Sequence, residues 1–138
     1  MILLDTSALL AAYDGDEPDH ETALRALDES QPPRVLSPFV LAELDYLVVA
    51  RLGRTARSEI LNEVTLGAYR LAQFAADDVA EARTIVDRYA DLGVGLADAS
   101  IVVLAHRYDA HDLLTLDERH FRVLQGPRGP FRLLPADE

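Results

Sequence analysis

Short apolar runs recur along this chain and alternate with segments of helical length. The runs lie at residues 2–4, 35–36, 113–116 and 131–135 and are rich in leucine, isoleucine, valine or phenylalanine. Between them, apolar residues recur at helical spacing, as in the stretch 38–53. Short apolar strands joined by helices are typical of a parallel sheet that helices cover on both faces. The sequence therefore predicts an α/β fold in three layers, with a central, mostly parallel sheet flanked by helices.

The positions of the helices follow from apolar spacing and from residues that begin or end helices. Pro38 after Ser37 is a favoured helix start, because proline at the first helical position lacks an N–H that would have no partner. We expect a further strand-like segment at 69–74 and an edge strand at 131–135. No internal repeat, low-complexity tract or linker divides the chain, so we expect one domain over residues 1–138. Helices are predicted over residues 6–13, 19–29, 38–53, 55–66, 77–89 and 96–108.

Composition excludes several classes of protein. The chain has 138 residues, of which 49% are hydrophobic and 27% charged, as in folded rather than disordered domains. It has no cysteine, which excludes disulfides, thiol catalysis and cysteine-ligated zinc, and its four histidines lack an HExxH-like spacing. No apolar run reaches the roughly 18 to 20 residues of a membrane span, and no signal peptide is evident. We therefore expect a cytoplasmic protein.

The charge of the chain is strongly negative but unevenly distributed. The formal net charge is −11, which argues against non-specific binding to nucleic acid. All 13 basic residues are arginines, and four of them lie within residues 46–76. Arg51, Arg54 and Arg57 lie near the end of a predicted helix, where they are either solvated cations or ligands for the phosphates of RNA.

Four acidic residues stand in apolar surroundings. Asp5 and Asp117 each follow directly on an apolar strand, Glu43 lies on a largely apolar helix, and Asp98 lies near the start of another. Because the carboxyl ends of parallel strands meet at one edge of a sheet, we expect Asp5 and Asp117 to be neighbours there. Each acid also has a structural interpretation: the three aspartates as residues of a helix cap or first turn, and Glu43 as a solvated or ion-paired residue.

A cluster of carboxylates requires a counter-charge. Two like charges about 4 Å apart repel by roughly 4 kcal/mol at an effective dielectric constant near 20. The chain has no lysine, and no arginine lies inside the four acidic motifs, so a divalent cation with oxygen ligands, Mg²⁺ or Mn²⁺, is the expected counter-charge. Thr6, Ser7 and Thr115 are expected to orient the acids through hydrogen bonds, although each is also a plausible cap or turn residue. His120 is interpreted as a surface or packed histidine.

Four segments together resemble a known family. "LLDTSALL", "PFVLAEL", "LADASIVVLA" and "LLTLDERHF" follow the order and spacing of the PIN-domain ribonucleases, and the chain is similar to VapC-type toxins of bacterial toxin–antitoxin pairs. The resemblance implies a PIN domain over residues 1–138 that cleaves structured RNA, either tRNA or ribosomal RNA, with Mg²⁺ or Mn²⁺ and so inhibits translation. It also implies a homodimer that a VapB-like antitoxin neutralises. The implied metal-binding and catalytic quartet is Asp5, Glu43, Asp98 and Asp117, supported by Ser7 and Thr115.

Other functions fit the sequence less well. Aspartyl-phosphate phosphatases and phospho-receiver domains need a lysine, which this chain lacks, and a dinucleotide-binding domain needs GxGxxG after its first strand. One alternative remains open: a catalytically inactive PIN-fold binding protein whose carboxylate cluster is structural. Dependence of activity on a metal distinguishes the two.

Overall fold

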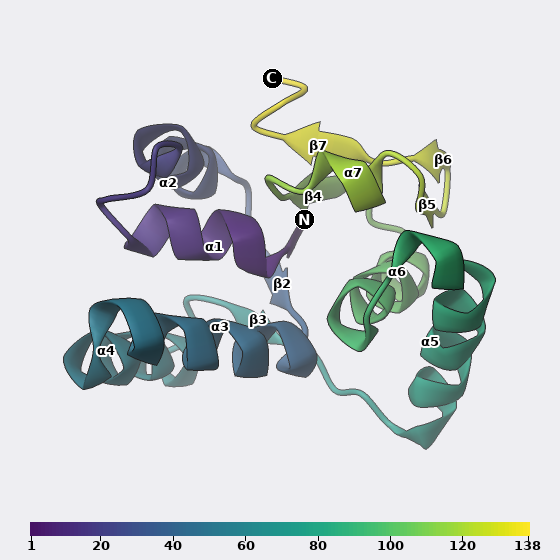
Figure 1. The fold of residues 1–138 in the computed structure, drawn as a ribbon, viewed down its shortest axis with the longest axis horizontal. Coiled ribbons are helices and arrows are strands. Elements are labelled where there is room, and N and C mark those ends of the chain that lie inside the picture. Colours follow the sequence, from purple (N-terminus) through teal and green to yellow (C-terminus); the bar gives the residue numbers. More distant parts are fainter.

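The computed structural model describes residues 1–138 and contains a five-stranded, entirely parallel sheet (Figure 1). The strand order is β3-β2-β1-β4-β7, so β1 is central and β7 is an edge strand. Leu3 of β1 is paired with Val35 on one side and with Leu113 on the other. The α/β fold is confirmed. The five strands are β1 (Ile2–Leu4), β2 (Arg34–Leu36), β3 (Arg70–Leu71), β4 (Asp112–Leu114) and β7 (Arg132–Leu134).

Helices surround the sheet in packed pairs (Figure 1). The pairs α1–α2, α3–α4 and α5–α6 are each in contact, and α1 and α6 both pack against α3. The six predicted helices are all present, with bounds that differ by at most one residue. No helix has the length and hydropathy that a membrane span requires. The helices are α1 (Thr6–Tyr13), α2 (His20–Glu29), α3 (Pro38–Leu52), α4 (Arg54–Thr65), α5 (Ala76–Arg88), α6 (Leu96–Tyr108) and α7 (Glu118–Phe121), with a 3-10 turn η1 (Ala90–Leu92).

Four short features differ from the sequence prediction. The segment 69–74 is mostly irregular, and only Arg70–Leu71 pairs with β2 at the edge of the sheet. A hairpin of two-residue strands, β5 (Gln125–Gly126) and β6 (Gly129–Pro130), forms where no strand was predicted. The helix α7 and the turn η1 were not predicted. These elements are short and mostly polar or exposed, so they lack the buried apolar run that marks the three-residue central strands.

The central strands form the middle of the hydrophobic core. All three residues of β1 are buried, and Leu113 and Leu114 of β4 are fully buried. Helices on both faces leave no exposed side for these strands, which is why they are continuously apolar rather than alternating. The core therefore holds the carboxyl ends of β1 and β4 side by side in a fixed position.

We predict that Leu113→Ala lowers the free energy of unfolding by about 2–5 kcal/mol, because it removes a fully buried side chain and leaves a cavity in the sheet. Leu66→Ala is the control, because Leu66 is 78% exposed and its loss should change stability by at most about 0.5 kcal/mol. Urea denaturation followed by circular dichroism measures both values. Equal losses in the two variants would contradict this account of the core.

Candidate functional site

A cavity of about 490 Å³ opens at the carboxyl ends of β1 and β4. Asp5 follows β1 and donates its backbone N–H to Leu114 O at 2.9 Å, so the two strand ends are in direct contact. Side chains from four separate parts of the chain reach the cavity. All four acids singled out in the sequence line it: Asp5, Glu43, Asp98 and Asp117.

Two hydroxyl groups hold the Asp5 carboxylate. Ser7 Oγ donates to Asp5 Oδ2 at 2.6 Å, and Thr115 Oγ1 donates to the same oxygen at 2.7 Å. Each hydroxyl also accepts a backbone N–H, Ser7 from Leu116 and Thr115 from Asp117, both at 2.9 Å. These bonds join the residues after β1 to those after β4. Asp5 is therefore oriented by a network rather than acting as a side-chain cap of α1, in which it makes no capping hydrogen bond.

The side chain of Thr6 does not take part in this network. Its hydroxyl is buried and has no hydrogen-bond partner. Successive side chains in a helix project about 100° apart, so the direction that brings Ser7 to Asp5 turns Thr6 away from it. The Thr6 side chain therefore does not make the hydrogen bond that was expected to orient the acids; Ser7 and Thr115 make the side-chain contacts, and only the Thr6 backbone interacts with the Asp5 carboxylate.

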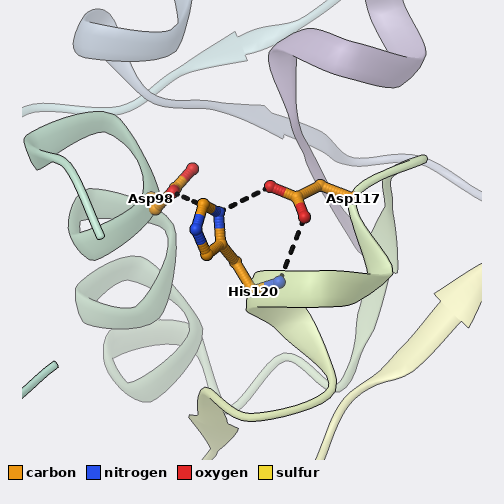
Figure 2. A group of neighbouring side chains, drawn as sticks. All are labelled: Asp98, Asp117 and His120. Atoms are coloured by element: carbon orange, nitrogen blue, oxygen red, sulfur yellow. Dashed lines mark hydrogen bonds and ion pairs between the residues drawn. The ribbon is translucent and has the colours of Figure 1, made fainter. Parts of the chain in front are cut away.

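His120 lies among the acids, contrary to its interpretation as a surface or packed residue (Figure 2). Its Nδ1 is 2.7 Å from Asp117 Oδ2 and 3.3 Å from Asp98 Oδ2, and its backbone N–H donates to Asp117 Oδ1 at 3.0 Å. Its Nε2 is 3.0 Å from Leu92 O. Carboxylate and carbonyl oxygens only accept, so a protonated His120 donates from both ring nitrogens and carries a positive charge between them.

A protonated His120 corrects the expectation, based on the absence of lysine and of nearby arginines, that the protein supplies no cation inside the carboxylate cluster. Burial tends to lower the pKa of His120, but the hydrogen bonds with Asp117 and Leu92 O and the nearby carboxylates outweigh it, so the pKa is raised. The contact between Asp117 and His120 could have been predicted from the sequence. Asp117 and His120 are three residues apart at the start of a helix, a spacing that places side chains on one helical face.

Electrostatic interactions connect the four acids. The pKa of Asp98 rises to about 6, mainly because the carboxyl is buried and then because the Asp5 carboxylate is near; Asp117 and Glu43 add to the rise, and His120 opposes it. Burial also raises the pKa of Asp5, against the hydrogen bonds from Ser7 and Thr115. Glu43 is exposed at the cavity and makes no hydrogen bond or ion pair. This set of hard oxygen donors, two of them destabilised when ionised, suits a divalent cation.

Comparison with known proteins agrees with this geometry. A family model described as "PIN domain" matches residues 2–126. The chain belongs to the PIN-domain family. It is 45% identical to Ribonuclease VapC26 of Mycobacterium tuberculosis (strain ATCC 25618 / H37Rv) over 135 residues, which are 97% of this chain and 100% of that protein.

Solved PIN-domain structures share the fold. The crystal structure of M. tuberculosis VapC20, described as a sarcin–ricin loop cleaving toxin, has a TM-score of 0.78 at 23% identity, covering 85% of this chain and 90% of that one. VapBC2 from Rickettsia felis, bound to a DNA fragment from its promoter, has a TM-score of 0.66 at 21% identity, covering 96% and 98%.

The three arginines singled out in the sequence lie in different settings in this PIN domain. Arg51 lines the cavity and forms an ion pair with Glu17. Arg57 instead binds both carboxylate oxygens of Asp45, at 2.5 and 2.7 Å, and so connects α4 to α3. Arg54 neither lines the cavity nor forms an ion pair. Of the three, only Arg51 lies at the candidate site.

We predict that Asp98→Asn stabilises the metal-free protein above pH 6. The folded state holds the Asp98 proton up to about pH 6, whereas the unfolded chain releases it near 3.8, so stability falls as pH rises through this window. Removing the charge should recover about 1–2 kcal/mol, since one pKa unit corresponds to about 1.4 kcal/mol and the carboxyl stays partly solvated.

Urea denaturation in EDTA at pH 7.5 and pH 4 measures this gain, which should vanish at the lower pH. Asp87→Asn, on the exposed face of α5, is the control and should show no comparable gain. A loss of stability in Asp98→Asn at pH 7.5 would contradict the interpretation that the Asp98 charge is unfavourable in the folded state.

Proposed function

We propose that this PIN-domain protein is a VapC-type toxin, an endoribonuclease that depends on Mg²⁺ or Mn²⁺. The observation that carries the proposal is the cavity at the ends of β1 and β4, where carboxylates from four separate segments converge. A cluster of this kind is destabilising without a counter-charge, as the raised pKa values of Asp5 and Asp98 indicate. The 45% identity to a ribonuclease over nearly the whole chain supports the same activity.

In the proposed mechanism, Asp5, Asp98 and Asp117 hold the cation, and Glu43 either completes the ligand set or accepts a proton from the attacking water. Bound there, a divalent cation supplies Lewis-acid chemistry, which activates water and neutralises charge on phosphate oxygens. Ser7 and Thr115 keep the Asp5 carboxylate in one orientation through their hydrogen bonds. Glu43 suits either role because its carboxylate is exposed at the cavity and has no partner.

We further propose that the substrate is a structured RNA, tRNA or ribosomal RNA, so that cleavage inhibits translation in the cytoplasm. Arg51 is the one arginine that lines the acidic cavity, and we assign it the contact with the phosphate backbone. Local positive charge of this kind reconciles RNA binding with a formal net charge of −11.

A VapB-like antitoxin and a second copy of this chain are the proposed protein partners. The supporting observation is the kind of protein that shares the fold. Besides VapBC2, a toxin–antitoxin complex from Klebsiella pneumoniae has a TM-score of 0.67 at 18% identity, covering 90% of this chain and 92% of that one.

We predict that the purified protein cleaves folded tRNA or ribosomal RNA with Mg²⁺ or Mn²⁺, and that EDTA abolishes cleavage. Asp5→Ala should lower the rate by about 100-fold or more, because it removes a ligand held at the centre of the site. Asp87→Asn is the matched control and should cleave at the wild-type rate. Mapping of new RNA ends measures the activity.

The alternative is an inactive PIN-fold protein that binds a partner and uses the carboxylates structurally. The position of His120 supports this alternative in one respect, because a positive charge on its ring partly neutralises Asp98 and Asp117 without a metal. That protein would not cleave RNA under any metal condition. Cleavage that persists in EDTA, or in Asp5→Ala, would also count against the proposed enzyme.

We predict that Arg51→Ala weakens RNA binding, whereas Arg57→Ala does not, because Arg57 is engaged by Asp45 away from the cavity. Loss of one phosphate contact should reduce the slope of log K against log salt concentration by about 1. Fluorescence anisotropy with labelled RNA, in an Asp5→Ala background that prevents cleavage, measures the slope. Equal slopes for the parent and its Arg51→Ala derivative would exclude this role for Arg51.

A further inference from the structure

We propose that His120 is itself a metal ligand through Nδ1, where the ion replaces the Nδ1 proton and the proton is released to solvent, so that the site has a mixed nitrogen and oxygen donor set. This inference rests on the proposed metal-dependent function and adds to its four carboxylates a residue from α7. Three observations carry it: the spacing of the donor atoms, the orientation of the ring, and the position of His120 among the residues that line the cavity.

The spacing matches that of neighbouring ligands around one ion. Nδ1 of His120 lies 3.3 Å from Asp98 Oδ2 and 2.7 Å from Asp117 Oδ2 (Figure 2), and one ligand atom from each residue lies within 4.8 Å of the others. Adjacent ligands on an octahedron with bonds of about 2.1 Å are about 3 Å apart. Shifts of a few tenths of an ångström therefore bring the two contacts of Nδ1 to the spacing of adjacent ligands.

The ring is held in the orientation that a ligand requires. Nε2 donates to Leu92 O at 3.0 Å, which leaves Nδ1 directed at the carboxylates. Metal-binding histidines almost always donate the other ring N–H to a carbonyl or a carboxylate. The backbone N–H of His120 also donates to Asp117 Oδ1, so the imidazole and the Asp117 carboxylate move as one unit.

A simpler role for His120 is to position Asp117 without touching the ion. In that case the imidazole would remain a hydrogen-bond donor to the carboxylate, and the ion would have oxygen ligands only. The two roles predict different metal preferences. An imidazole ligand favours Mn²⁺ over Mg²⁺, which strongly prefers oxygen, whereas a positioning residue favours neither.

Electron spin-echo envelope modulation of the Mn²⁺-bound full-length protein tests the assignment directly. A coordinated imidazole couples ¹⁴N to the Mn²⁺ electron spin, so we expect ¹⁴N modulation in the wild type and its replacement by ¹⁵N coupling after [¹⁵N]histidine labelling. His120→Gln should lose the modulation, whereas His106→Gln, a change outside the cavity, should keep it. The wild-type spectra decide the question even if His120→Gln does not fold.

Calorimetric titration gives a second readout. His120→Gln should weaken Mn²⁺ binding by about tenfold or more and Mg²⁺ binding by less, because only the first ion gains from a nitrogen ligand. Stoichiometric Mn²⁺ binding without ¹⁴N modulation in the wild type would overturn the inference, as would equal losses of affinity for the two ions. If RNA cleavage persists in that case, the proposed function stands and only the role of His120 fails. Absence of any Mn²⁺ or Mg²⁺ binding would overturn both.

Discussion

Repulsion between carboxylates at one edge of the sheet is the constraint on which the rest of this site depends. Burial and mutual charge raise the pKa of Asp98 to about 6, and burial raises that of Asp5, so the folded chain holds these groups against their electrostatic preference. The free energy that opposes this repulsion comes from elsewhere in the molecule. Burial of the central strands contributes to it and fixes the strand ends from which Asp5 and Asp117 follow.

Local hydrogen bonds stabilise the carboxylates against their mutual repulsion. Ser7 and Thr115 each donate to Asp5 and accept a backbone N–H, so the polar groups at the joined ends of β1 and β4 are satisfied as a network. His120 lies within hydrogen-bond distance of Asp117 and close to Asp98, and its other ring nitrogen donates to Leu92 O, so a protonated ring supplies a positive charge beside the two acids. The result is a cluster of carboxylates that the fold holds in place at the expense of stability in the metal-free protein.

How well each element of the structure could be predicted depends on how many of its residues contribute to a recognisable sequence pattern. The buried strands and the longer helices were predicted within one or two residues, because hydrophobic period and helix-start residues such as Ser37 and Pro38 act locally. The proximity of Asp5 and Asp117 was also predicted, because a parallel sheet brings its strand ends together, and the resemblance to PIN-domain ribonucleases added Glu43 and Asp98. The hairpin of β5 and β6 and the short helix α7 carry too few side chains for such a pattern, and His120 was misjudged along with α7.

The sequence by itself determined the parallel α/β architecture, the edge of the sheet at which the acids meet, and the identity of those acids. Only the tertiary structure decided which polar residues serve them. Ser7 rather than Thr6 contacts Asp5, and Arg51 reaches the cavity while Arg57 binds Asp45. The physical reason is that hydrophobic periodicity depends on residues that are neighbours in the sequence. Which of two adjacent hydroxyls, or of two nearby guanidinium groups, reaches the site depends instead on side-chain directions, which packing between distant segments sets.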